Sequence, residues 1–241
     1  MRITFIVLLA LCASSTFAQH LTFEEWHQRA LVDIRLRPRY GDVPKSAGQL
    51  ESDAAFVQQV LSNDSTPRAA SAHLLGLGYN YLRSGDHVSA MYRFNQAFLL
   101  DSTNTDIYLA YGTFFMELDK PVMAHTMFRG GLSMDSTHVA LLTAEATAYL
   151  AEEYVMRSKD PVAANALAEK AKNMLMRAVR YAPEDQDALQ RLVVCNVKLH
   201  DCDAAWTWFK RYRAAAGAGA GVDVETTLRK ECPPQRADPK H

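Results

Sequence analysis

The sequence predicts an all-α protein, an α-solenoid in which helical hairpins stack into a right-handed superhelix. Two observations carry this prediction. The segment that begins at Ser71 matches the segment that begins at Thr105 after a shift of 34 residues, and apolar residues recur in both at helical spacing. The composition permits a packed core, because 49% of the 241 residues are hydrophobic and 22% are charged. Each hairpin leaves an apolar face that a neighbouring hairpin must bury, so the units are expected to stack.

Residues 1–18 are expected to be a cleaved signal peptide and not part of the fold. A basic residue precedes an apolar run over residues 3–11, which is too short to span a bilayer, and small residues end at Ala18. The mature chain would then begin at Gln19 and be exported, either to the periplasm or to the exterior. A lipid anchor at Cys12 is the less favoured alternative, because a leucine stands where a lipoprotein signal needs a small residue.

Two helices and a loop are expected over residues 19–70, where they would cap the array. The first helix follows Thr22, a residue type that favours the N-cap, and runs over residues 23–35. Residues 37–48 contain proline and glycine and predict a loop. A second helix is expected over residues 49–62, with apolar residues on one face.

Residues 71–104 and 105–138 form the two clearest repeats. In the first, Gly78 and Ala90 place small side chains where two helices would cross, and Phe94 fills the space around the crossing. Each unit resembles the tetratricopeptide repeat, a helix–turn–helix of 34 residues. The residues that carry the resemblance are Leu74, Leu77, Gly78, Tyr81, Gly85, Ala90, Phe94 and Ala97, then Tyr108, Tyr111, Gly112, Phe115, Ala124, Phe128 and Gly131.

Two further hairpins and a cap are expected after these repeats. Residues 139–185 predict an elongated third hairpin, whose second helix begins at Pro161 after a break in the helical pattern. A fourth hairpin is expected over residues 186–216. Residues 217–241 predict a turn of alternating glycine and alanine, a short capping helix and a tail.

The charge balance and the apolar pattern exclude two classes of partner. The 26 basic and 27 acidic residues give a formal net charge of −1, without the basic excess typical of nucleic-acid binding. Beyond the N-terminus no apolar run is long enough for a membrane span. We therefore expect neither nucleic acid nor an internal membrane span.

Three cysteines remain once the signal peptide is removed, and an exported protein usually meets an oxidising compartment. If the capping helix docks as the next repeat would, its C-terminal end places Cys232 beside the turn that holds Cys202. The expected disulfide is therefore Cys202–Cys232, with Cys195 buried in its helix. A metal site built from Cys195, His200 and Cys202 is not favoured, because it offers three ligands without a familiar zinc spacing.

No catalytic motif is evident, so we expect no catalytic residue, no cofactor and no metal. The chain has no glycine-rich phosphate loop, no Gly-x-Ser-x-Gly elbow and no His-Glu-x-x-His. The adjacent carboxylates of Glu152 and Glu153 would point about 100° apart on a helix. They are expected on a solvated face.

The resemblance implies a binding face, because the first helices of tetratricopeptide hairpins line a concave groove that receives peptides. The alternative is that Leu75, Leu82 and Leu109 pack against N-terminal helices folded into that groove. Tyr79 and Met116 are expected to lie outside the hairpin core. The predicted groove residues are Leu75, Tyr79, Leu82, Arg83, Leu109, Thr113, Met116 and Glu117, and the same face continues through Thr143, Thr147, Leu150, Gln190, Val194 and Lys198.

The tripeptide Asp-Ser-Thr occurs at three expected helix ends, with its serine at Ser65, Ser102 and Ser136. It is similar to the O-glycosylation acceptor of some bacterial periplasmic systems. The alternative is helix-end chemistry without a sugar, because aspartate, serine and threonine all favour such boundaries.

The sequence therefore predicts an exported, non-catalytic scaffold that binds an unidentified protein or peptide in the groove of a tetratricopeptide-like array. The second hypothesis is a structural component of envelope assembly that acts by self-association. The oligomeric state stays open, with a monomer favoured.

Overall fold

A computed structural model describes residues 21–63, 66–217 and 219–233. The expected signal peptide with Cys12, the serine at position 65 and the residues after Pro233 lie outside this part of the chain. The helices are α1 (Phe23–Val32), η1 (Ile34–Leu36), η2 (Pro38–Asp42), α2 (Ala47–Leu61), α3 (Pro67–Arg83), α4 (His87–Leu100), α5 (Asp106–Glu117), α6 (Pro121–Met134), α7 (Val139–Met156), α8 (Pro161–Tyr181), α9 (Gln186–Lys198), α10 (Cys202–Ala216) and α11 (Val222–Glu231), where η marks a 3₁₀ helix.

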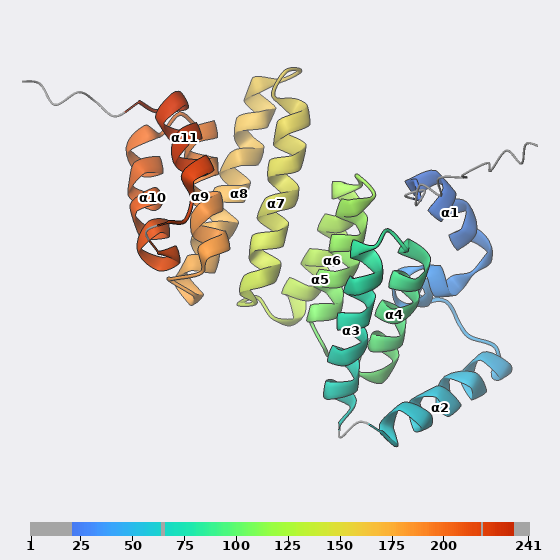
Figure 1. Ribbon diagram of the computed structural model, residues 1–241. Helices are drawn as coiled ribbons and strands as arrows, with labels where there is room; N and C mark the ends of the chain where they lie inside the picture. Colours follow the sequence, from blue (N-terminus) through green and yellow to red (C-terminus); the bar gives the residue numbers. More distant parts are fainter. Residues whose placement is uncertain (1–20, 64–65, 218, 234–241) are drawn as a thin grey trace, which may run out of the picture.

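Helices α3 to α10 form four consecutive hairpins, each of which packs on the next (Figure 1). Helix α11 follows the last hairpin and contacts α9, as the first helix of another repeat would. This arrangement confirms the predicted all-α array of tetratricopeptide-like hairpins. Within the described part of the chain, no helix is long and apolar enough to cross a membrane.

The first hairpin begins with α3, whose start is fixed by a cap and a proline. Thr66 is the N-cap of α3, its side chain accepts a hydrogen bond from the backbone N–H of Ala69, and Pro67 occupies the first helical position. Proline suits that position because its fixed backbone angle is helical and its missing N–H would be unpaired there. Ser71, where the 34-residue match begins, lies four residues after the start of α3.

Glycine allows the close helix crossing in both regular hairpins. A Cβ added to Gly78 would lie 2.4 Å from the Phe94 ring, and one added to Gly112 would lie 2.0 Å from the Phe128 ring. Two non-bonded carbon atoms cannot approach this closely, so each ring occupies the space that a side chain at the glycine would need. The two crossings are equivalent, as the shift of 34 residues predicted.

The third hairpin is longer than its neighbours, as expected. Helix α7 has 18 residues and α8 has 21, against 14 in α4 and in α6. Asp160 caps α8, because its carboxylate accepts hydrogen bonds from the N–H groups of Val162 and Ala163. The tip of this hairpin projects beyond the adjacent hairpins (Figure 1).

The N-terminal segment turns sharply within the loop that the sequence predicted. Arg39, Tyr40, Gly41 and Asp42 all have positive φ, between 52° and 72°. A non-glycine residue pays about 1–2 kcal/mol for this left-handed conformation. The turn is held by the Tyr111 hydroxyl, which accepts a hydrogen bond from the Arg39 N–H at 3.1 Å.

Candidate functional site

The first helices of successive hairpins lie side by side and are joined by polar contacts. The Ser71 hydroxyl of α3 accepts a hydrogen bond at 3.0 Å from the Asn104 amide, which lies just before α5. Further along, the Arg191 Nε of α9 donates to the Thr147 hydroxyl of α7 at 2.7 Å. Between them, the His138 Nε2 at the start of α7 lies 2.9 Å from the Asp106 Oδ1 of α5, so the helices α3, α5, α7 and α9 form one continuous face. We call this surface the first-helix face.

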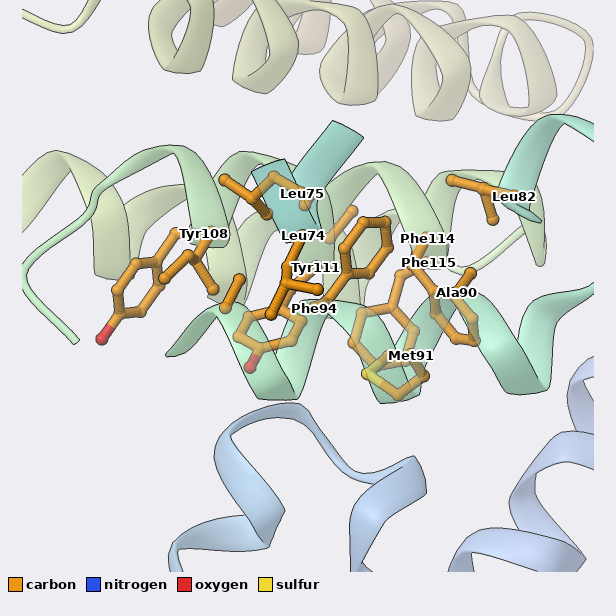
Figure 2. Packing of buried hydrophobic residues seen from close by; sticks show 14 of the residues in the cluster. Leu74, Leu75, Leu82, Ala90, Met91, Phe94, Tyr108, Tyr111, Phe114 and Phe115 are labelled. Atoms are coloured by element: carbon orange, nitrogen blue, oxygen red, sulfur yellow. The ribbon is translucent and has the colours of Figure 1, made fainter. Parts of the chain in front are cut away.

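Two of the predicted groove residues are not available to a ligand. Leu75 is 5% exposed and Leu82 is 6% exposed, and both belong to the hydrophobic core around α3 and α5. Their assignment to an open groove is therefore wrong. Figure 2 shows both side chains within the packed cluster, together with Leu74 and Phe94. When helices pack this closely, more than one side chain per turn is buried, so residues beside the predicted packing positions are covered too.

Tyr79 also packs against the hairpin core, contrary to expectation. Its ring lies edge-on against Phe94, with centroids 5.4 Å apart, and burial raises the pKa of its hydroxyl to about 12. Thr113 lies beside it and donates its own hydroxyl to the Leu109 carbonyl. Tyr79 is a supporting residue of the face, because replacing it would disturb the core. Leu109 and Met116 are only partly buried, while Arg83 and Glu117 are exposed.

The N-terminal segment lies on a different side of the array from the first-helix face. Trp26 stacks edge-on against Phe114 and Phe115, and the Asn95 amide of α4 donates to the carbonyls of Arg35 and Arg37. Figure 2 shows the Tyr108 and Tyr111 hydroxyls on the side of the core that faces this segment, with Leu75 and Leu82 on the other. The alternative that these helices fill the groove is therefore wrong.

A hollow does open on the first-helix face, between α9 and α11. It has a volume of about 490 Å³, and its floor is aliphatic, with Val193 and Leu228 buried beneath it. Val194 and Lys198, which the sequence assigned to the groove, both line it. The remaining lining residues are Arg157, Val197, His200, Asp223, Val224, Thr227 and Glu231.

Glu153 organises the charges at one end of this hollow. Its side chain is fully buried, so the expectation of a solvated face is wrong for this residue. The carboxylate binds the Lys198 Nζ at 2.5 Å and the Arg157 Nε at 2.6 Å. One buried negative charge thus faces two positive charges. The helical spacing from Ala146 through Tyr149 to Glu153 places all three on one buried stripe, and this spacing is the signal that reveals the residue.

The Cys202–Cys232 disulfide is present in the structure, with the two Cα atoms 5.3 Å apart. It is the pairing expected from docking the capping helix as a further repeat. Cys195 is a free thiol, fully buried in α9, and burial raises its pKa to about 12. A thiol in that state is a poor nucleophile and a poor metal ligand, because only the thiolate reacts.

A second buried carboxylate serves packing. Glu145 of α7 accepts a hydrogen bond from Arg129 Nε at 2.9 Å and lies 2.8 Å from the His125 Nδ1 of α6. Both oxygens are engaged, so the group ties α6 to α7. Across the described residues, no group of three or more His, Cys, Asp or Glu side chains is placed to hold a metal ion.

The serines of the repeated tripeptide are exposed at Ser102 and Ser136. At both sites the threonine, and not the serine, serves the turn: Thr103 donates its N–H and its hydroxyl to Asp101, and Thr137 does the same to Asp135. Helix-end chemistry therefore uses Asp and Thr and leaves the serine side chain at the surface. O-glycosylation at these serines stays a prediction.

Comparison with known proteins adds little to this description. No family model matches the chain, and no curated protein matches it. Among solved structures, the crystal structure of PilW, a widely conserved type IV pilus biogenesis factor, is similar at 16% identity with a TM-score of 0.35. The match covers 67% of this chain and 85% of the PilW chain. The protein is a tetratricopeptide-like helical array, as its own paired helices show.

Proposed function

We propose that the protein is an exported, non-catalytic scaffold that holds a segment of another protein along its first-helix face. The observation that carries the proposal is the position of the N-terminal segment, which packs on the other side of the core. Leu109 and Met116 remain partly exposed as a result, and the aliphatic hollow between α9 and α11 lies on the same face. Apolar side chains that stay exposed in a fixed frame are suited to anchoring a peptide.

Two observations support export. The N-terminal residues have the layout of a signal peptide, and the Cys202–Cys232 disulfide is typical of proteins that fold in an oxidising compartment. The partner is a protein or peptide, since the near-neutral charge offers no general attraction to nucleic acid.

A second candidate function is self-association. The tip of the third hairpin carries large apolar side chains that contact little of the chain: Tyr154 is 77% exposed, Val155 57% and Val162 80%. These side chains would form a contact between copies of the chain, because exposed apolar surface of this kind often marks an interface.

Site-specific cross-linking separates the two candidates. A photoreactive amino acid replaces Val194 on the first-helix face, Val162 at the tip, or the exposed Asn173 of α8 as a control. The scaffold function predicts a defined adduct with another envelope protein from position 194. A self-adduct from position 162 with none from 194 would support the alternative. Equal adducts from 194 and 173 would contradict the scaffold function.

A further inference from the structure

Helix α11 forms one wall of the hollow, yet its own packing is sparse. Of its ten residues only Leu228 is buried. A salt bridge joins its Glu225 to Arg213 at 3.0 Å. The chain that leads into α11 contains Gly217 and Gly221, both with positive φ, and such residues restrain a helix weakly.

The C-terminal end of α11 is held much more firmly. The disulfide fixes Cys232 to Cys202, the first residue of α10, and the Trp206 Nε1 donates to the Cys232 carbonyl at 2.9 Å. Because Cys202 follows the turn after α9, this link places the end of α11 beside the end of α9. The disulfide therefore sets the separation of the two helices that enclose the hollow.

The hollow carries opposite charges at its two ends. At the disulfide end, Arg157 and Lys198 both bind the carboxylate of Glu153, so two positive charges face one negative charge. Glu231 also lines this end, and its carboxylate lies 3.3 Å from the Lys230 Nζ. These five side chains together carry a net charge of +1. At the other end stands Asp223, in the first turn of α11. From Asp223 to the last turn of α11 is eight residues, or about 12 Å at 1.5 Å per residue.

We propose that this hollow binds an extended segment of the partner in which an aliphatic residue is flanked by one basic and one acidic residue. The Cys202–Cys232 disulfide is required for this binding, because it holds α11 at the right distance from α9. The aliphatic side chain enters the valine-lined floor, the basic group faces Asp223, and the acidic group faces Lys198 and Arg157. An extended chain advances about 3.3 Å per residue, so the two charges lie about four positions apart. This inference rests on the proposed scaffold function and names the chemistry of the segment it would hold.

The test uses the mature, oxidised protein and the peptide acetyl-Lys-Ala-Leu-Ala-Glu-amide as the probe. Titration is followed by NMR through the signals of Val194, Val197 and Val224. We expect saturable shifts at these positions and at least tenfold weaker binding when the leucine of the peptide is replaced by serine. A peptide with glutamate at both ends should also bind at least tenfold more weakly, and Asp223→Lys should restore its binding. Equal binding of all three peptides would overturn the proposed recognition.

The role of the disulfide is tested separately. Dithiothreitol supplies two electrons and two protons, which convert the disulfide to two thiols while the reagent closes to its cyclic disulfide. Reduction should weaken the probe at least tenfold, and the double variant Cys202→Ser, Cys232→Ser should bind as weakly with or without the reagent. Unchanged binding after reduction would overturn this part of the proposal. If the double variant does not fold, Val194→Asp provides a second test, because it places a charge in the floor of the oxidised site. Full probe binding by this variant would overturn the proposed site.

The peptide test and the cross-linking test fail independently. If the probe does not bind while position 194 still forms an adduct with an envelope protein, the scaffold function stands and this inference falls. If the probe binds as described while no adduct forms, the hollow is a peptide site and the proposed scaffold function falls.

Discussion

The two ends of the array are closed by different means. Around α3 to α6 the core is aromatic, with Phe94, Tyr111, Phe114, Phe115 and Phe128 at most 1% exposed, and the N-terminal segment covers one side of it by packing and hydrogen bonds. Around α9 to α11 the core is largely aliphatic, and the terminal helix is tied by a covalent bond. The difference teaches that a short terminal helix with few apolar side chains needs a covalent bond to hold it on the array. A longer segment can cover the end of the array by burying apolar side chains alone.

The largest effect is expected from the aromatic core. Phe94→Ala removes a fully buried ring that fills the crossing at Gly78 and supports Tyr79, so it should lower the free energy of unfolding by about 3–5 kcal/mol. Urea denaturation followed by circular dichroism measures the change. The control Val122→Ala, at a position 69% exposed, should stay within about 0.5 kcal/mol. A small effect of Phe94→Ala would mean that the first hairpin does not depend on this crossing.

Reduction of the disulfide should have the next largest effect, confined to the other end. The bond joins residues 30 positions apart, which corresponds to about 2–4 kcal/mol of stabilisation. Hydrogen exchange should speed up in α11 and at the start of α10, which holds Cys202, while α3 to α6 stay protected. The Cys202→Ser, Cys232→Ser variant provides the control, because the reagent should not change it further. Uniform loss of protection along the chain would show that the two ends unfold together.

Tyr111→Phe tests how the N-terminal segment is held. The hydroxyl accepts from the Arg39 N–H and donates to Asn95 Oδ1 at 2.6 Å, so its loss leaves a buried donor unpaired at about 1–3 kcal/mol. Limited proteolysis should then cut the turn between Pro38 and Asp42 sooner, with the hairpins intact. Tyr154→Phe, at an exposed site, is the matched control. Unaltered cleavage would show that burial alone holds the segment.

The smallest effect is expected from acid. The Arg35 side chain, with further help from Tyr92, holds the pKa of Asp33 at about 2, below the value of about 3.9 in an unfolded chain. The folded state therefore binds fewer protons, so this contribution is present above about pH 4 and is lost as the pH falls towards 2. The NMR signal of the Trp26 indole, followed against pH, should report loosening of the segment in that window. Asp33→Asn should remove this pH dependence, and an unchanged profile would contradict the assignment.

Much of the fold could be predicted because equivalent positions in successive repeats make equivalent contacts. The close crossing at Gly78, the break before Pro161 and the Cys202–Cys232 pair all follow from local spacing or from docking one unit as the last was docked. The candidate site was harder, since the exposure of Leu75 or Leu82 depends on how closely neighbouring helices approach. The periodicity of a single helix gives no information about its distance from the neighbouring helices.

The sequence by itself determined the all-α hairpin array and the order of its helices. These are local consequences of helical periodicity and of turn and cap residues. Only the tertiary structure decided that the N-terminal segment packs away from that face, that Glu153 is buried between Lys198 and Arg157, and that the hollow lies between α9 and α11. Each of these depends on side chains far apart in the chain, whose meeting is set by packing and by the pairing of buried charge.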